Sequence, residues 1–439
     1  MGKGVLTHAT TRVSHPAYEP FPRVGGALHC EGIALEALAE RVGTPAYVYS
    51  TAAIREQYRL LDSAFATLPH RLHYSVKANS SLAVLALLRE LGAGLDIVSG
   101  GELHRAMLAG FTGADIVFSG VGKTERELHE ALTVGVRLVN VESEGELLLL
   151  DEVARRRGVL APVALRVNPE VAVQTPHEYT RTGSRGHKFG IPFDDALDAA
   201  RLATTLKGIR LLGLDMHIGS QISEFEPYGA AIERVLELRR RIERECDTKL
   251  TVLDVGGGLS VPYDDEAPAD VERYARGVSE LVADTGLDLV LEPGRFLVAN
   301  AGILLTRVLY RKRSGTKEYV IADAGMNDLM RPSHYQAFHH VEAVVPNGGR
   351  GTADVVGPVC ESGDFFALER LMDDVRPGEL LAVRSAGAYG FVMASNYNSR
   401  PRAAEVLVDG DRYAIATERE RYEDLVRQEH VNPTWSTIR

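Results

Sequence analysis

The sequence predicts an α/β protein: a (β/α)8 barrel of the TIM type, combined with a mostly β carboxy-terminal domain that is a barrel or a sandwich. With 439 residues, the chain is too long for one core of ordinary size, so two domains are expected. Short β-branched runs alternate with longer helical patterns between about residues 70 and 300. After Asn300 the pattern changes to strands separated by turn residues.

Eight strand candidates follow one another in the first region, and amphipathic helical patterns, such as 124–132 and 228–245, fill most of the gaps between them. Eight β-α repeats favour a closed parallel barrel. An open doubly wound sheet is the alternative, weakened because no dinucleotide-binding glycine pattern follows the first strand. The candidates are RLHYSVK (71–77), GLDIVS (94–99), DIVFSG (115–120), RLVNV (137–141), VALRVN (163–168), LLGLDMHI (211–218), LTVLDVGG (250–257) and DLVLEPG (288–294).

The region after residue 300 has few long helical patterns before its end, which predicts a mostly β domain. We expect the barrel over 47–300 and the β-rich domain from 1–46 and 301–439, with AYVYS (46–50) as a possible link between the two. The strand-like runs of this domain are GILLTRVLY, KEYVIADAG, FHHVEAVV, ADVVGPV, ELLAVRSAGAY and AAEVLVDG.

Charge and cysteine content restrict the class of protein. Lys and Arg number 49 and Asp and Glu 60, so the net charge of −11 disfavours nucleic acid or an anionic membrane as a main partner. Three distant cysteines suggest neither a disulfide framework nor a metal site, and they indicate the cytoplasm. The amino terminus has no apolar core for a secretory signal, and no run reaches the length of a membrane span.

Polar residues and glycines gather where the predicted strands end, which is the edge where a barrel of this type carries its active site. Since parallel strands of a closed barrel point the same way, these residues are expected to share one rim. They are Lys77 after strand one, Asp96 and Ser99 at strand two, Asn168 at strand five, His217 at strand six, Gly256, Gly257 and Gly258 at strand seven, and Glu292 at strand eight.

The glycine triplet and Lys77 each allow two interpretations. The glycines of DVGGGLS form either a tight turn or a place where backbone N–H groups approach a phosphate closely. Lys77 is either a solvated charge or an amine that attacks a carbonyl to form a Schiff base. A phosphate site beside such a lysine indicates pyridoxal 5′-phosphate (PLP).

Two further rim residues fit that cofactor. The pyridine nitrogen of PLP needs an acidic partner, which Glu292 could provide, although a salt bridge from Glu292 to Arg295 is the alternative. His217 could stack on the ring, although a lone histidine is more often buried and satisfied by its neighbours. The joint placement of these residues on successive strand ends favours the cofactor site.

Six motifs in order resemble the PLP-dependent decarboxylases of alanine-racemase-like fold: YSVKAN, HIGSQ, GGG, EPGR, GPVCESGD and AGAYG. The resemblance covers about residues 45 to 400 and leaves residues 1–25 without a role. It includes the loop QTPHEYTRTGSRGHKFGIP, which departs from the family at His187.

The resemblance implies a role for each motif. Lys77 carries PLP and Cys360 is the acid that reprotonates the substrate carbon, so these two are the catalytic residues. Cys360 and Glu361 reach into the partner subunit's site, so the implied assembly is a homodimer with shared active sites. The cofactor is bound by Lys77, His217, Ser220, Gly257, Gly258, Glu292, Pro293, Gly294, Arg295 and Tyr389, with no metal.

The substrate implied within this family is the amino acid meso-2,6-diaminopimelate, decarboxylated at its D-centre to L-lysine and carbon dioxide. Its distal carboxylate needs a guanidinium and a hydroxyl donor, which Arg295, Arg331 and Tyr335 could supply. Glu361 fits the distal ammonium, and Tyr389 contacts both cofactor and substrate. Ornithine-type relatives instead have Cys-Asp at the position of Cys360-Glu361.

Three alternatives stay open at this point. A racemase on the same fold needs a second base on the opposite face of the ring, and Cys360-Glu361 and Arg331 argue against it. A non-catalytic regulator would lack the lysine or the cysteine, and both are present. A related decarboxylase could act on ornithine, lysine, arginine, a carboxylated polyamine such as carboxynorspermidine, or a carrier-bound amino acid.

Overall fold

The computed structural model describes residues 19–171 and 187–438, which form two compact units. The first unit contains Ser50–Gly302 and Arg384–Val392, with the described residues up to Pro22. The second contains Arg23–Tyr49, Ile303–Val383 and the described residues from Met393 on. Among the helices described, none is long and apolar enough to cross a membrane.

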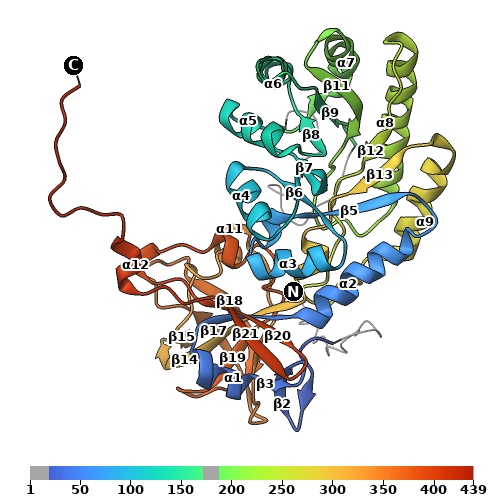
Figure 1. Ribbon diagram of the computed structural model, residues 1–439. Helices are drawn as coiled ribbons and strands as arrows, with labels where there is room; N and C mark the ends of the chain where they lie inside the picture. The colour runs from blue at the N-terminus through green and yellow to red at the C-terminus, as the bar shows by residue number, and fades with distance from the viewer. Residues whose placement is uncertain (1–18, 172–186, 439) are drawn as a thin grey trace. The chain divides into compact units, whose positions relative to one another are not determined.

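Eight parallel strands close into a barrel in the first unit (Figure 1). The last strand pairs with the first through Leu291 and Leu72, so the sheet has no open edge and the doubly wound alternative is excluded. All eight predicted strands are confirmed, and a short strand, β10 (Ile191–Pro192), adds to β9. The barrel strands are β5 (His70–Ser75), β6 (Gly94–Ile97), β7 (Ile116–Phe118), β8 (Leu138–Val141), β9 (Ala161–Asn168), β11 (Ile209–Asp215), β12 (Val252–Asp254) and β13 (Asp288–Leu291).

Helices connect the successive strands and lie outside the barrel, from blue α2 to yellow α9 in Figure 1. The helix α2 precedes the first strand and contacts α9, the last connecting helix, so it closes the outer ring. The helices are α2 (Thr51–Ala64), α3 (Leu82–Glu90), α4 (Gly100–Leu108), α5 (Glu125–Val134), α6 (Glu144–Arg157), α7 (Ala196–Thr205), α8 (Glu226–Glu245), α9 (Val271–Val282) and α10 (Arg295–Val298), with single 3₁₀ turns at η1 (Val76–Ala78), η2 (Gly113–Asp115), η4 (Phe193–Asp195) and η5 (Ala283–Thr285).

The interior of the barrel is built in layers. An apolar layer packs Val117, Leu138, Ala164, Val252 and Val290 together, with Leu212 against it. Side chains two residues apart on a strand share a face. The next interior side chain toward the carboxyl end of each strand therefore comes two residues after each of the five packed residues. Those positions are all polar: Ser119, Asn140, Arg166, Asp254 and Glu292.

The second unit is built on a mixed sheet in the order β18-β17-β15-β14-β4-β20-β21, with β19 also pairing β14, and β16 pairing β19. AYVYS, predicted as a possible link, forms β4 in the middle of this sheet, and its first four side chains are buried. The strands are β4 (Ala46–Ser50), β14 (Gly302–Ser314), β15 (Lys317–Ala322), β16 (Val341–Ala343), β17 (Arg350–Val356), β18 (Phe365–Asp373), β19 (Leu380–Val383), β20 (Ala404–Asp409) and β21 (Arg412–Thr417).

Smaller elements complete the second unit. A separate three-stranded sheet contains β1 (Arg23–Val24), β2 (Ala27–Cys30) and β3 (Ile33–Ala34). The remaining elements are α1 (Leu35–Val42), α11 (Arg331–Tyr335) and α12 (Tyr422–Val426), with 3₁₀ turns at η6 (Phe391–Met393) and η7 (Tyr397–Ser399). The prediction of a β-rich second part is confirmed, while the division of roles between two domains stays a prediction.

Candidate active site

Lys77 follows β5 on a single 3₁₀ turn, and its amine contacts buried acceptors. Its Nζ donates to Asp96 Oδ2 at 2.6 Å and to Ser75 Oγ at 3.4 Å. Burial alone lowers the pKa of Lys77, but the carboxylates of Asp96 and Glu292 outweigh it, so the pKa lies above the ordinary lysine value. Without a cofactor Lys77 is therefore an ammonium held by Asp96.

The glycine triplet follows β12 and packs its backbone against that of neighbouring segments. A Cβ on Gly257 would lie 2.1 Å from the carbonyl oxygen of Glu292. A Cβ on Gly258, whose φ is +110°, would lie 2.5 Å from the carbonyl oxygen of Gly219. These contacts exclude side chains at both positions. The three glycines line the pocket, and their role toward a phosphate stays a prediction.

Arg295 begins α10 and is held on three sides. Its guanidinium donates to Tyr263 Oη at 2.6 Å and to Ser220 Oγ at 3.3 Å, and it lies 4.8 Å from the centre of the Tyr389 ring. The predicted alternative, a salt bridge between Arg295 and Glu292, is not among the ion pairs of the described residues. Tyr389 is itself fixed, because its backbone N–H donates to the carbonyl of Ala78.

His217 lies beside the glycine triplet as a neutral imidazole. Its Nδ1 accepts a hydrogen bond of 3.2 Å from the backbone N–H of Gly257, which places the ring proton on Nε2. Burial, with Arg166 and Lys77 nearby, lowers the pKa of His217 to about 3. A flat, uncharged ring therefore lines the site at neutral pH.

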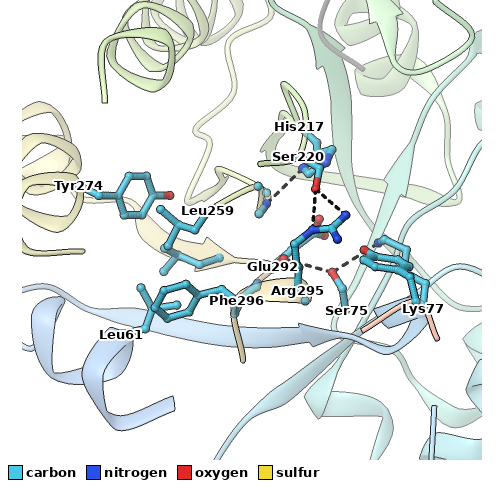
Figure 2. Close-up of a pocket in the computed structure, with 17 residues that line it drawn as sticks. Leu61, Ser75, Lys77, His217, Ser220, Leu259, Tyr274, Glu292, Arg295 and Phe296 are labelled. Carbon is cyan, nitrogen blue, oxygen red and sulfur yellow. Dashed lines mark hydrogen bonds between the residues drawn. The ribbon is translucent and has the colours of Figure 1, made fainter. Parts of the chain in front are cut away.

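These groups line one pocket of the first unit, with an empty volume of about 520 Å³ including its mouth. Figure 2 shows Lys77, Ser75 and Glu292 close to Arg295, with Ser220 and His217 beyond the guanidinium. The pocket collects all ten predicted cofactor residues: Lys77, His217, Ser220, Gly257, Gly258, Glu292, Pro293, Gly294, Arg295 and Tyr389.

The other predicted site residues lie in the second unit. Cys360 and Glu361 are exposed on the loop between β17 and β18, where the Cys360 N–H donates to Asn398 Oδ1. Arg331 is buried at the start of α11, with its Nη1 3.0 Å from His339 Nε2, and Tyr335 ends the same helix half-buried. Their functional roles stay predictions, and residues 172–186 of the family-like loop lie outside the described residues.

Sequence reasoning missed several polar groups around the pocket. Asp96 was noted at a strand end but was not selected, although it binds Lys77. Ser119 and Asn140 donate to Glu292 Oε1 at 3.1 and 3.4 Å, and carboxylate oxygens of Asp215 and Asp254 lie within 4.8 Å of Glu292. Their regular position, two residues beyond an apolar interior residue, could have identified Ser119, Asn140 and Asp254.

The sequence matches a protein family across more than half of the chain. Residues 51–299 match the model described as "Pyridoxal-dependent decarboxylase, pyridoxal binding domain". The chain therefore belongs to the pyridoxal-dependent decarboxylases, and the family predicted from the six motifs is confirmed.

Particular members are similar along almost the whole chain. The diaminopimelate decarboxylase of Pseudomonas fluorescens is 50% identical over 417 residues, covering 94% of this chain and all of that protein. The crystal structure of diaminopimelate decarboxylase from Helicobacter pylori complexed with L-lysine has a TM-score of 0.87 at 38% identity, and covers 90% of this chain and 99% of that chain. The enzyme from M. jannaschii in co-complex with L-lysine has a TM-score of 0.90 at 34% identity, and covers 94% of this chain and 98% of that chain.

Proposed function

We propose that this protein uses PLP to decarboxylate meso-2,6-diaminopimelate at its D-centre, giving L-lysine and carbon dioxide. The observation that carries the proposal is the single pocket in which Lys77, Glu292 and the glycine triplet meet. Relatives that carry the name diaminopimelate decarboxylase, at 50% identity over nearly the whole chain, support the substrate. The same reaction makes the protein the last enzyme of lysine biosynthesis from diaminopimelate.

The residues of the pocket fit PLP. Gly257 and Gly258 line the pocket without side chains, so they leave room for a phosphate group, and Ser220 adds a hydroxyl. Lys77 offers an amine for the aldehyde, and Glu292 offers a carboxyl group for the ring nitrogen. The neutral imidazole of His217 suits contact with the flat face of the ring.

Bound PLP supplies an electron-accepting ring that stabilises the negative charge left when carbon dioxide departs. The chain's own groups control protons around it. Asp96, 2.6 Å from Lys77 Nζ, accepts the proton that the ammonium must lose before the amine can attack an aldehyde. Glu292 holds a proton at the ring nitrogen, and Cys360 Sγ delivers a proton to the substrate carbon.

The second unit contributes the substrate contacts in this proposal. Arg331 and Tyr335, with Arg295 of the first unit, bind the distal carboxylate by charge and hydrogen bonding, and Glu361 binds the distal ammonium. Tyr389 contacts both the cofactor and the substrate. Cys360 and Glu361 act from the partner subunit of a homodimer. The three free cysteines support a reducing compartment, the cytoplasm.

The first experiment compares carbon dioxide release from meso-diaminopimelate, ornithine, lysine and arginine by the purified, PLP-loaded protein. We expect meso-diaminopimelate to react fastest and Lys77→Ala to lose both the activity and the near-ultraviolet absorbance of the bound cofactor. Faster turnover of ornithine would contradict the roles of Arg331 and Tyr335. Racemisation of the substrate without release of carbon dioxide would show that the protein is a racemase and not a decarboxylase.

The shared active site has its own test. Lys77→Ala and Cys360→Ala proteins are each inactive in this proposal, but a mixed dimer contains one site with both native residues. Activity should therefore return when the two proteins are mixed under conditions that exchange subunits. No return of activity after proven exchange would contradict a site shared between subunits.

A further inference from the structure

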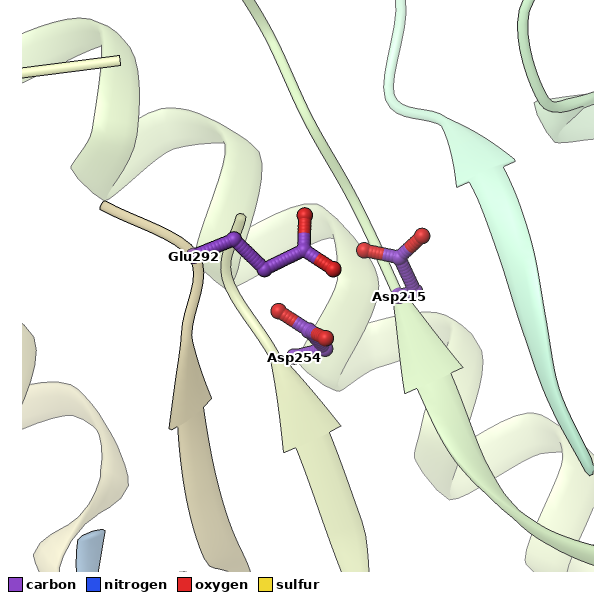
Figure 3. A group of neighbouring side chains, drawn as sticks. All are labelled: Asp215, Asp254 and Glu292. Carbon is purple, nitrogen blue, oxygen red and sulfur yellow. The ribbon is translucent and has the colours of Figure 1, made fainter. Parts of the chain in front are cut away.

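Three buried carboxyl groups meet at the carboxyl ends of β11, β12 and β13 (Figure 3). Oxygen atoms of Asp215, Asp254 and Glu292 lie within 4.8 Å of one another. Asp254 and Asp215 are 0% and 1% exposed, so solvent does not screen their charges. Only Glu292 lines the cofactor pocket, whereas the two aspartates lie next to it in the barrel interior.

The cations near this cluster already have partners. Lys77 binds Asp96 at 2.6 Å, and Arg166 Nη1 donates to Glu142 at 2.9 Å. The remaining ion pair, from Arg166 Nε to Asp215 Oδ2, is 3.7 Å long. Lys77 and Arg166 are thus two positive charges among five carboxyl groups. Two positive charges cannot balance five negative charges in a buried site, so some of the carboxyl groups are protonated. The five are Asp96, Glu142, Asp215, Asp254 and Glu292.

The geometry of the cluster indicates where the protons are. Oxygen atoms of Glu292 and Asp254 lie within 4.8 Å of each other, and two neighbouring buried carboxyl groups share a hydrogen bond only when one of them is protonated. Neither oxygen of Asp215 has a hydrogen-bond partner among the described residues, which is costly for a buried carboxylate. Burial and the neighbouring carboxylates raise the pKa of Asp215 and Asp254 well above the ordinary value, and that of Glu292 to about 7.

We infer that Asp254, supported by Asp215, is a positioning residue that stores a proton in the barrel and stabilises Glu292 when Glu292 protonates the ring nitrogen of the cofactor. The inference rests on the proposed function. The O–H bond of the Glu292 carboxyl group breaks, and an N–H bond forms with the lone pair of the ring nitrogen. Glu292 then carries the negative charge that pairs with the ring, and the Asp254 O–H donates to it.

The test starts with cofactor-free protein, whose protonated carboxyl groups have their own infrared carbonyl band. Wild-type protein at pH 7 should show this band, and Asp254→Asn should remove part of it. Asp151→Asn is the matched control, because Asp151 is buried outside the barrel, where it accepts hydrogen bonds from Gly208 and Arg155. Absence of the band in wild-type protein, or a band that Asp254→Asn leaves intact, would overturn the inference.

A second measurement distinguishes a positioning role of Asp254 from a purely structural one. Asparagine still donates a hydrogen bond to Glu292, so Asp254→Asn should change PLP affinity by less than about twofold, whereas Asp254→Ala should weaken it about tenfold. Equal loss in both variants would overturn the inference. Asp215→Asn, which should also lose part of the band, repeats the test if Asp254→Ala does not fold.

A failure of this inference can be distinguished from a failure of the proposed function. If wild-type protein binds no PLP, the function fails while the infrared result on cofactor-free protein still stands. A divalent cation could neutralise the same charges, so cofactor-free protein is also titrated with Mg²⁺. Binding of Mg²⁺ that removes the infrared band would overturn the inference, and no such binding supports it.

Discussion

At the scale of single residues, Gly257 has the shortest contact that an added Cβ would make among the glycines that line the pocket. A methyl group there would meet the carbonyl oxygen of Glu292 at 2.1 Å, and backbone cannot move aside as a flexible side chain can. Gly257→Ala should therefore displace Glu292 and weaken PLP binding by at least about tenfold, measured by absorbance titration.

The matched control is Gly145→Ala. Gly145 lies in α6 with nothing within 4 Å of an added Cβ, and alanine is the better helix former. PLP affinity should be unchanged in this variant. Equal affinity in Gly257→Ala and wild-type protein would contradict the displacement of Glu292.

The buried residue His73 makes the folding stability of the protein depend on pH. It is 1% exposed on β5, and burial lowers its pKa from 6.5 to about 4. Between these values the unfolded chain binds the extra proton, so stability falls as the pH falls through this window. The contribution lost is at most about 3 kcal/mol.

The measurement compares urea unfolding of wild-type protein and His73→Gln at pH 7 and pH 4.5. The variant should lose less stability between the two pH values, because glutamine does not titrate. His217, with its pKa of about 3, adds to the acid sensitivity of both proteins. An identical loss in both proteins would contradict the assignment to His73.

The cofactor pocket was more predictable than the groups that support it. Lys77, His217 and Glu292 follow strands that the sequence pattern locates, and a closed barrel brings such ends together. Asp96, Asp215 and Asp254 occur in strands too, but their function depends on which strands are neighbours. The pairing of Asp215 with Asp254 across β11 and β12 is a long-range contact that no local pattern contains.

At the scale of elements, α5 offers a test of a predicted helix start. Thr124 precedes the helix, its side chain accepts from the Glu127 N–H, and Glu127 binds back to the Thr124 N–H. Thr124→Ala should cost about 1 kcal/mol in urea unfolding because the Glu127 N–H loses its acceptor, whereas the backbone N–H of position 124 keeps its bond to Glu127. Thr133→Ala, on the exposed side of the same helix, should be neutral or slightly stabilising, and an equal loss in both variants would contradict the cap.

Strand prediction succeeded in the barrel and was incomplete in the second unit. The barrel strands are β-branched runs buried on both faces, which is a strong signal. The strand β18 was missed because its centre, ALERLM, consists of good helix formers. Pairing with β17 overrides that preference, and Leu368 and Leu371 remain exposed. The strand β21 was missed because it has little buried surface.

At the scale of the whole molecule, the cofactor should stabilise the protein. A ligand that binds only the folded chain adds about 2.7 kcal/mol at a free concentration of about one hundred times its dissociation constant. The melting temperature should therefore rise with PLP concentration, and the rise should shrink in Lys77→Ala, which lacks the covalent link. A melting temperature independent of PLP would contradict a folded cofactor site.

The position of β4 has a consequence for the order in which the protein folds during its synthesis. This strand leaves the ribosome early, yet its sheet neighbours β14 and β20 begin at Gly302 and Ala404, about 250 and 350 residues later. The four apolar side chains of β4 therefore lack their sheet neighbours while the barrel strands are being synthesised. Barrel formation can thus precede completion of the second sheet, which closes around β4 only after β20 has been made.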